Sequence, residues 1–201
     1  PNVVFDTTMN AFQKIEQKKD TLPTVDDELY LETHRGTLTS AAYMKKYNRD
    51  SEIKAEETEK FNFIATILGS ESYPQRKINK AWDKTNLNQF HDVLPGSSIT
   101  PVYNDAFNDA EIALNQLNGA LKNAMNGIGN RINTEGEGKA LVLYNPLSWD
   151  REDMVESEVI LSSEDKKIAI LDENGKEVPS QIVNKNGAKV TVSYKAKVPA
   201  M

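Results

Sequence analysis

The 201-residue sequence contains no cysteine and only two histidines. Without cysteine the chain can form neither a disulfide nor a thiolate metal site, and a reducing, cytoplasmic setting fits this composition. No cluster of Cys and His with metal-ligand spacing exists, because the only imidazoles belong to His34 and His91. A zinc centre needs three or four protein ligands, so a complete centre is not expected within this chain alone.

Long apolar runs and an excess of basic residues are also missing. No run approaches the roughly 20 apolar residues of a membrane span. The formal net charge of -6 gives no electrostatic reason to bind nucleic acid or an anionic membrane surface. The first residues lack the pattern of a signal peptide, and the chain does not begin with Met, so we expect an excised piece of a longer protein. Hydrophobic residues make up 38% of the chain, enough for a real core.

The spacing of the apolar residues changes near residue 130, from a helical period to the alternation of strands. The first part predicts an amphipathic helix over 5–18, an extended connector, and an antiparallel bundle of three long helices joined by short connections. The second part predicts antiparallel β structure as the start of a sandwich, with two hairpins centred on Asn-Gly pairs. These pairs are Asn174-Gly175 and Asn186-Gly187. The predicted fold class is α+β, with domains at 1–33, 34–130 and 131–201.

Capping residues predict where the helices of the bundle begin and end. Thr39 or Ser40 is expected to cap a short helix, and Asp50 or Ser51 to cap a longer one, by accepting a bond from a free backbone N–H. Gly69 is expected to close the longer helix. The strand-like run at the end of the sequence has no obvious partner. Because a β domain of about 60 residues with an unpaired last strand would be marginal, we take this as a second sign of truncation.

The buried faces of the three long helices are predicted from residues that recur every three or four positions. On the first helix these are Ile53, Phe61, Ile64, Ile67 and Leu68. On the second and third helices they are Ile78, Ala81, Trp82 and Thr85, then Val102, Ala106, Ala110, Ala113, Leu117, Ala120, Leu121 and Ala124.

The stretch QFHDVLPG places a histidine and an aspartate at the predicted end of the second long helix. The apolar neighbours Phe90, Val93 and Leu94 imply that His91 is partly buried, and a neutral imidazole is a good zinc ligand. Adjacent residues lie about 100° apart around a helix, so His91 and Asp92 would not readily hold one metal from the same face. The residues alone leave two interpretations open: a metal ligand beside a group that binds something else, or a core histidine with a capping aspartate.

Three further residues, His34, Trp82 and Trp149, are candidates for function. His34 is interpreted as a turn residue whose ring bonds the backbone near a helix start. Trp82 and Trp149 are residue types that stack on sugars. Helical spacing favours a core position for Trp82, and the choice between stacking and packing stays open for Trp149.

Three blocks of sequence, in this order, resemble the α-mannosidases of glycoside hydrolase family 38. The junction into that family's helical middle domain resembles ELYLETHRGTLTSAAYMKKYNRDSE. A second hallmark of the family resembles AWDKTNLNQFHDVLPGSSITPVYNDA. The opening of its C-terminal β domain resembles LVLYNPLSWDREDMVE. Together they span about residues 28–160. The resemblance implies a retaining glycosidase with one divalent metal, usually zinc, held by two histidines and two aspartates. It implies that His91 is a metal ligand and that Asp92 binds the sugar substrate.

The resemblance also implies which parts of the enzyme lie outside this chain. The first metal-binding pair, the nucleophile and the acid/base would belong to an N-terminal catalytic domain, of which residues 1–33 would be the tail end and connector. We therefore expect no catalytic residue here and no activity from the fragment itself. The full enzyme would hydrolyse terminal α-mannosides, with the other domains of the same polypeptide as partners and a homo-oligomer left open. The alternatives are a mannosylglycerate-type hydrolase of this family and a non-catalytic carbohydrate-binding or assembly module.

Overall fold

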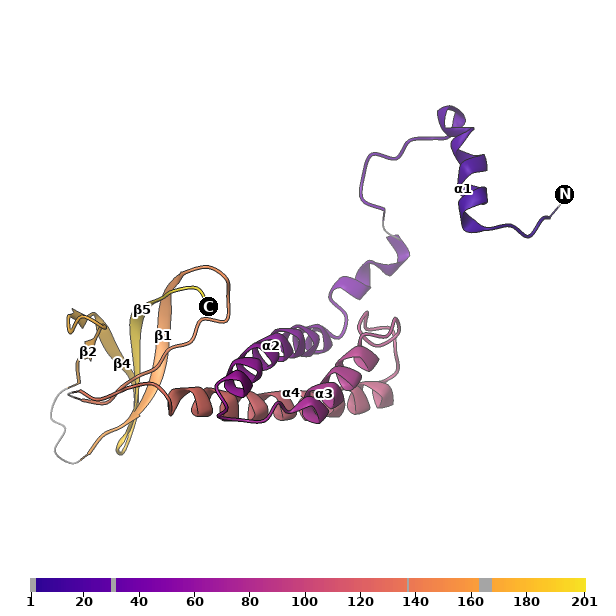
Figure 1. The fold of residues 1–201 in the computed structure, drawn as a ribbon. Helices are drawn as coiled ribbons and strands as arrows, with labels where there is room; N and C mark the ends of the chain where they lie inside the picture. Colours follow the sequence, from indigo (N-terminus) through magenta and orange to yellow (C-terminus); the bar gives the residue numbers. More distant parts are fainter. Residues whose placement is uncertain (1–2, 30–31, 137, 163–167) are drawn as a thin grey trace. The chain divides into compact units, whose positions relative to one another are not determined.

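The computed structural model describes residues 3–29, 32–136, 138–162 and 168–201. The chain divides into two units, Pro1–Leu38 and Thr39–Met201 (Figure 1). Residues 30 and 31 of the predicted connector lie outside the described residues. Within the described ranges, no helix combines the length and the apolar character needed to cross a membrane.

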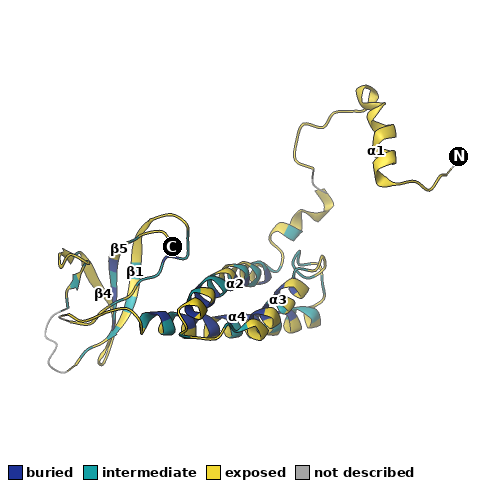
Figure 2. Cartoon of the chain, in the orientation of Figure 1, coloured by how far each residue is buried: buried dark blue, intermediate teal, exposed yellow. Residues whose placement is uncertain are grey.

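The described residues of the first unit form one α-helix and two 3₁₀ turns. These are α1 (Thr8–Glu16), η1 (Lys19–Thr21) and η2 (Glu32–Leu38). Helix α1 begins after Thr7, whose Oγ1 accepts a hydrogen bond from Asn10 N at 3.3 Å. The predicted helix over 5–18 is therefore present but shorter, because this cap places the first turn after Phe5. None of the residues of α1 is buried (Figure 2).

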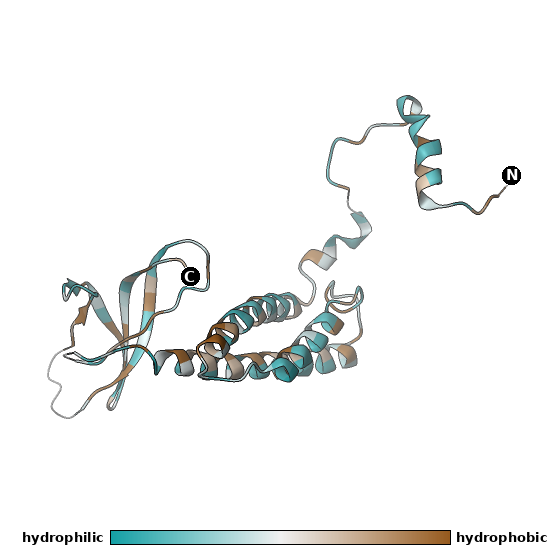
Figure 3. Cartoon of the chain, viewed as in Figure 1, coloured by the Kyte–Doolittle hydropathy of each residue, from teal (hydrophilic) through white to brown (hydrophobic). Residues whose placement is uncertain are grey.

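The second unit begins with the predicted three-helix bundle. Its helices are α2 (Ala42–Ile67), α3 (Gln75–Asn88) and α4 (Thr100–Gly129). Met44 near the start of α2 packs on Ala106 near the start of α4, and Phe61 packs on Leu121 further along, so these two helices run in the same direction. Asn88 at the end of α3 donates to Ala106 O at 2.9 Å, so α3 runs opposite to α4. Figure 3 shows apolar residues interspersed with polar ones along all three helices, as expected of amphipathic helices.

Helix α2 is one continuous helix of 26 residues, not a short helix followed by a longer one. Its N-cap is Ala41, with φ +49°, and no side chain caps its first turn, so the predicted caps Thr39 and Ser40 are wrong. Asp50 instead forms an ion pair with the lysine one turn earlier. Ser51, at 2% exposure, lies in the core. Aspartate and serine are therefore found here inside a helix, and their presence alone does not mark a helix start.

The buried face of α2 consists mainly of small and polar residues, which differs from the predicted apolar stripe. It is made of Met44, Ser51, Ala55, Thr58, Phe61, Asn62 and Ala65. Thr58 Oγ1 donates to Lys54 O at 2.6 Å, and Asn62 Nδ2 donates to Thr58 O at 2.8 Å, so these polar groups stay bonded when buried. Of the predicted stripe, Phe61 is buried and Ile64 packs against its cluster. Ile53, Ile67 and Leu68 are exposed. The predicted faces of α3 and α4 are confirmed, although Trp82 and Val102 are only half-buried.

The described strands of the second unit follow the bundle and pair antiparallel. A three-stranded sheet has the order β1-β5-β4, with β1 at Arg151–Ile160, β5 at Lys189–Val198 and β4 at Ser180–Asn186. A two-stranded sheet pairs β2 (Ile170–Leu171) with β3 (Glu177–Val178). Both predicted hairpins are confirmed. Gly175 and Gly187 adopt φ +76° and +60° at their turns, a region that glycine enters without steric cost.

The two sheets share one hydrophobic core. Val190, Val192 and Tyr194 of β5 are buried, and residues of β1 and of the β2 segment pack against them, including Val155 and Ile170. The α+β class with a sandwich-like β segment is therefore confirmed. The expectation that the last strand lacks a partner is wrong, because β5 is the central strand and pairs on both sides.

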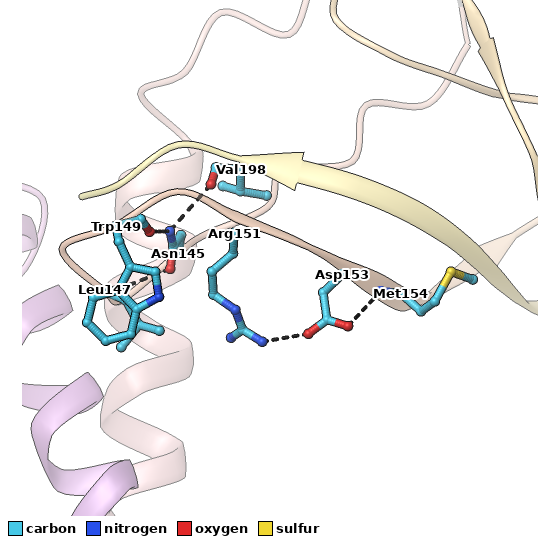
Figure 4. A network of polar contacts seen from close by, with 7 residues as sticks. All are labelled: Asn145, Leu147, Trp149, Arg151, Asp153, Met154 and Val198. Atoms are coloured by element: carbon cyan, nitrogen blue, oxygen red, sulfur yellow. Dashed lines mark hydrogen bonds and ion pairs between the residues drawn. The ribbon is translucent and has the colours of Figure 1, made fainter.

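The described residues 139–150, predicted as a β-rich run, form no strand, and Asn145 organises their path. This buried amide donates to Trp149 O at 2.7 Å, and its Oδ1 accepts from Leu147 N at 3.1 Å (Figure 4). It also donates to Pro199 O at 3.0 Å. A longer contact of 3.4 Å reaches Val198 O. The segment thus bonds to the end of β5 and the residues after it, through Asn145 and also through Asp150 Oδ1, which accepts from Ala200 N at 2.9 Å, and Leu147 O, which accepts from Met201 N at 3.0 Å.

Tyr144 packs this segment against the helical bundle. Its ring meets Phe61 of α2 edge-on, with ring centroids 5.4 Å apart, and its hydroxyl donates to Met125 O of α4 at 3.1 Å. Burial raises the pKa of the Tyr144 phenol above its usual range, because the charged phenolate would be poorly solvated there.

Candidate functional site

His91 and Asp92 lie in a turn that follows α3, and not on the helix itself. Helix α3 ends at Asn88, whose side chain is bonded to α4. The next residues form short turns, in which Phe90 N bonds Leu87 O at 3.2 Å. The helical separation of about 100° therefore does not apply to this pair. Instead, Nε2 of His91 lies 3.1 Å from Oδ2 of Asp92, within ion-pair distance.

The turn leaves the His91 side chain exposed, although its neighbours in the sequence are apolar. The side chains of His91 and Asp92 are 75% and 59% exposed, so the predicted partial burial of His91 is wrong. The ring of Phe90 lies 4.3 Å from the imidazole, but Phe90 is itself exposed. Val93 packs against the apolar cluster between α2 and α4. Apolar neighbours in sequence therefore anchor the turn without covering the histidine.

Tyr103 of α4 holds the turn at three backbone groups. Its hydroxyl donates to Val93 O at 3.0 Å, with Asp92 O at 3.3 Å as a second acceptor. The same oxygen accepts from Ser98 N at 3.2 Å. One phenol thus joins the two sides of the turn.

The start of α2 holds the turn from another side. Nζ of Lys45 donates to Leu94 O at 3.0 Å and to Ser40 O at 2.5 Å. Gly96 has φ +91°, and a Cβ at this position would lie 2.5 Å from Ser40 Cβ. Because no Cβ could fit there without displacement, the glycine lets the two backbones approach closely.

His91 fits one position of a metal site, but the described residues do not complete such a site. Within the described ranges, no group of three or more His, Cys, Asp or Glu side chains could hold a metal ion. The exposed imidazole could offer one nitrogen, whereas zinc takes three or four protein ligands. A metal held by His91 would therefore need further ligands from beyond these residues. The roles of His91 and Asp92 stay predictions.

The other candidate residues have contacts of their own. His34 is exposed in η2, and its Nδ1 lies 3.1 Å from Thr33 Oγ1, so the ring contacts a side chain and not the backbone as predicted. Trp82 is half-buried and its Nε1 donates to Glu59 Oε1 at 2.6 Å. Trp149 is 59% exposed. Within the second unit, no described contact joins Trp82 or Trp149 to the His91–Asp92 turn.

Sequence reasoning missed Lys45 and Tyr103, which hold the turn. Lys45 contacts a backbone carbonyl far from it in the sequence, and Tyr103 contacts backbone groups of a turn whose geometry the sequence does not give. No local pattern therefore predicted either residue. The Pro95-Gly96 pair did give a signal, because this dipeptide is typical of turns.

Comparison with known proteins gives consistent matches. The family model described as the α-mannosidase middle domain matches residues 32–128. The chain is 38% identical over 145 residues to an α-mannosidase of Saccharomyces cerevisiae, covering 70% of this chain and 13% of that protein. It is 32% identical over 156 residues to α-mannosidase 2C1 of Mus musculus, covering 77% of this chain and 15% of that protein. The chain thus spans about one seventh of these relatives.

Two solved structures share the fold. A glycosyl hydrolase family 38 protein from Enterococcus faecalis superposes with a TM-score of 0.67 at 20% identity, covering 97% of this chain and 26% of that one. An α-mannosidase from Enterococcus faecalis V583 gives a TM-score of 0.65 at 20% identity, covering 84% of this chain and 23% of that one. At this identity the likeness concerns the arrangement of helices and strands.

Proposed function

Since the chain belongs to the α-mannosidases of glycoside hydrolase family 38, through the middle-domain match at residues 32–128, we propose that it is part of a metal-dependent retaining α-mannosidase. The full-length enzyme would hydrolyse terminal α-mannosides. The observation that carries the proposal is the turn after α3, which presents His91 and Asp92 to solvent on a backbone held by two helices. Such side chains are free to meet a ligand.

In this proposal each residue of the pair has a separate task. His91 contributes one imidazole nitrogen to a divalent cation, proposed to be zinc, and Asp92 accepts hydrogen bonds from hydroxyls of the mannose ring. When bound, the cation supplies positive charge that orients sugar hydroxyls. The interaction between His91 and Asp92 at 3.1 Å would be exchanged for these contacts when both ligands are present.

The residues that break the glycosidic bond belong to another part of the enzyme in this proposal. Retaining glycosidases use one carboxylate as nucleophile and a second carboxyl group as acid and then base. We assign neither role to a residue of this chain, so the 201 residues alone should be inactive. The proposed partners are the N-terminal catalytic and C-terminal β domains of the same polypeptide and a mannoside substrate. The absence of cysteine supports the proposed cytoplasmic setting.

The test is His91→Ala in the full-length enzyme, with His34→Ala as the matched control. We expect His91→Ala to lose bound metal, measured by mass spectrometry of the purified protein, together with hydrolysis of an aryl α-mannoside. His34→Ala, which changes the other exposed histidine, should keep both. A His91→Ala enzyme with wild-type metal content and rate would refute the assignment.

Asp92→Asn separates the second task from the first. It should keep the metal but lower kcat/KM, because an amide is a weaker acceptor than a carboxylate for sugar hydroxyls. A panel of α-mannosides and mannosylglycerate in the same assay identifies the substrate class.

A further inference from the structure

We infer that Lys45 and Tyr103 are positioning residues, which fix the turn from which His91 and Asp92 project. This inference rests on the proposed function, because it concerns how that site is held. Neither residue would touch the metal or the sugar. Both would act through the backbone of residues 92–98.

Tyr103 sets the shape of the turn. Its hydroxyl contacts the carbonyls of Asp92 and Val93 on one side and the N–H of Ser98 on the other, so a single oxygen fixes the spacing between them. The ring is half-buried and packs near Phe107 of the same helix, with centroids 6.1 Å apart. Tyr103 thereby fixes the position of the turn relative to the start of α4.

Lys45 sets the place of the turn against α2. Its ammonium group donates to two backbone carbonyls, those of Leu94 and Ser40, and the residue is half-buried. Each hydrogen bond from a charged donor to a carbonyl is stronger than a neutral one. Together with the close approach of Gly96 to Ser40, this contact fixes the turn to the start of the helix.

The side chains of His91 and Asp92, which Lys45 and Tyr103 would hold in place through the backbone, contribute little to folding. His91 and Asp92 are 75% and 59% exposed, so the core does not require them to hold one orientation. A site that combines these side chains with ligands from another domain does require one orientation, because a small displacement of a ligand-binding group strongly weakens binding and catalysis. The two anchors therefore fit a role in preorganising the pair.

The experiment uses the full-length enzyme with Tyr103→Phe and Lys45→Met, which keep most of each side chain's bulk and remove only the polar contacts. The matched controls are Tyr43→Phe and Lys46→Met, at exposed positions of the same region. Zinc affinity is measured by competition with a chelator, and hydrogen exchange reports on the amides of residues 92–98. Lys45→Arg, which restores the charge and donors, serves as the rescue variant.

We expect Tyr103→Phe and Lys45→Met to weaken zinc binding on the order of 10-fold or more, as for other groups that orient a ligand indirectly. The amides of residues 92–98 should exchange faster, while the controls stay within about twofold of wild type and Lys45→Arg recovers part of the loss. Wild-type zinc affinity in both variants, with His91→Ala still losing the metal, would overturn the positioning role and leave the proposed function standing. Wild-type metal binding in His91→Ala as well would overturn both.

Discussion

Substitution of Gly96 by alanine should destabilise the second unit through its contact with Ser40. An added Cβ would lie 2.5 Å from Ser40 Cβ and 2.7 Å from Ser40 O. Carbon atoms in ordinary contact are about 3.5–4.0 Å apart, so one backbone would have to move by roughly 1 Å. The turn also has φ +91° at this residue, which a side chain disfavours.

The two costs add because they arise from different atoms. A left-handed backbone costs a residue with a Cβ about 1–2 kcal/mol. Crowding in a packed region costs about 1–3 kcal/mol more. We therefore expect Gly96→Ala to lower the free energy of unfolding by about 2–5 kcal/mol. Because the displaced segment carries His91 and Asp92, the proposed zinc site predicts that the zinc affinity of the full-length enzyme falls as well.

Gly119→Ala provides a control of opposite sign. Gly119 lies inside α4, and nothing lies within 4 Å of the position of its added Cβ. Alanine there should raise the free energy of unfolding by about 0.5–1 kcal/mol, because glycine loses more backbone entropy in a helix. Urea unfolding of both variants followed by circular dichroism measures the two effects. If Gly96→Ala unfolds at the wild-type urea concentration while Gly119→Ala is stabilised, the reasoning about the close approach is refuted.

Three further predictions concern the core and the β segment. Leu117 is 1% exposed, so Leu117→Ala should lower the free energy of unfolding in urea by about 2–5 kcal/mol. Leu87 is 62% exposed, so Leu87→Ala should change it by no more than about 0.5 kcal/mol, and equal effects would contradict the assigned core. Asn145→Ala should cost about 1–3 kcal/mol and speed hydrogen exchange of the last residues, and unchanged exchange would contradict its anchoring role. Because the pKa of Tyr144 is raised in the folded protein, this phenol loses its proton at a lower pH in the unfolded chain. The free energy of unfolding should therefore fall as the pH rises above the ordinary pKa of 10.0, and should fall less in Tyr144→Phe. Identical pH profiles of the two proteins would contradict this.

The sequence predicted those parts of the fold that depend on strong local signals. The apolar period of α4 identified its buried face from Ala106 to Ala124, and both Asn-Gly pairs formed their turns. The buried face of α2 could not be predicted in the same way. Thr58 and Asn62 are buried because their polar groups bond back to their own helix, and hydropathy does not report this.

The candidate site shows the same limit. Family resemblance pointed to His91, but its exposure depends on where α3 stops, and that follows from contacts between helices. The anchors of the turn reach across the fold, so they became visible only in three dimensions. The central position of β5 also escaped prediction, because pairing on two sides is a property of the sheet and not of one strand.

The order of strands has a consequence for synthesis on the ribosome. The three helices of the bundle are consecutive in the chain and can pack as they emerge, whereas β1 must wait for a partner that begins only at Lys189. At about 5–20 residues per second, that delay lasts a few seconds, during which the backbone N–H and C=O groups of the nascent β1 have no β5 strand to pair with. Chaperone capture should therefore concentrate on nascent chains that end between β1 and β5.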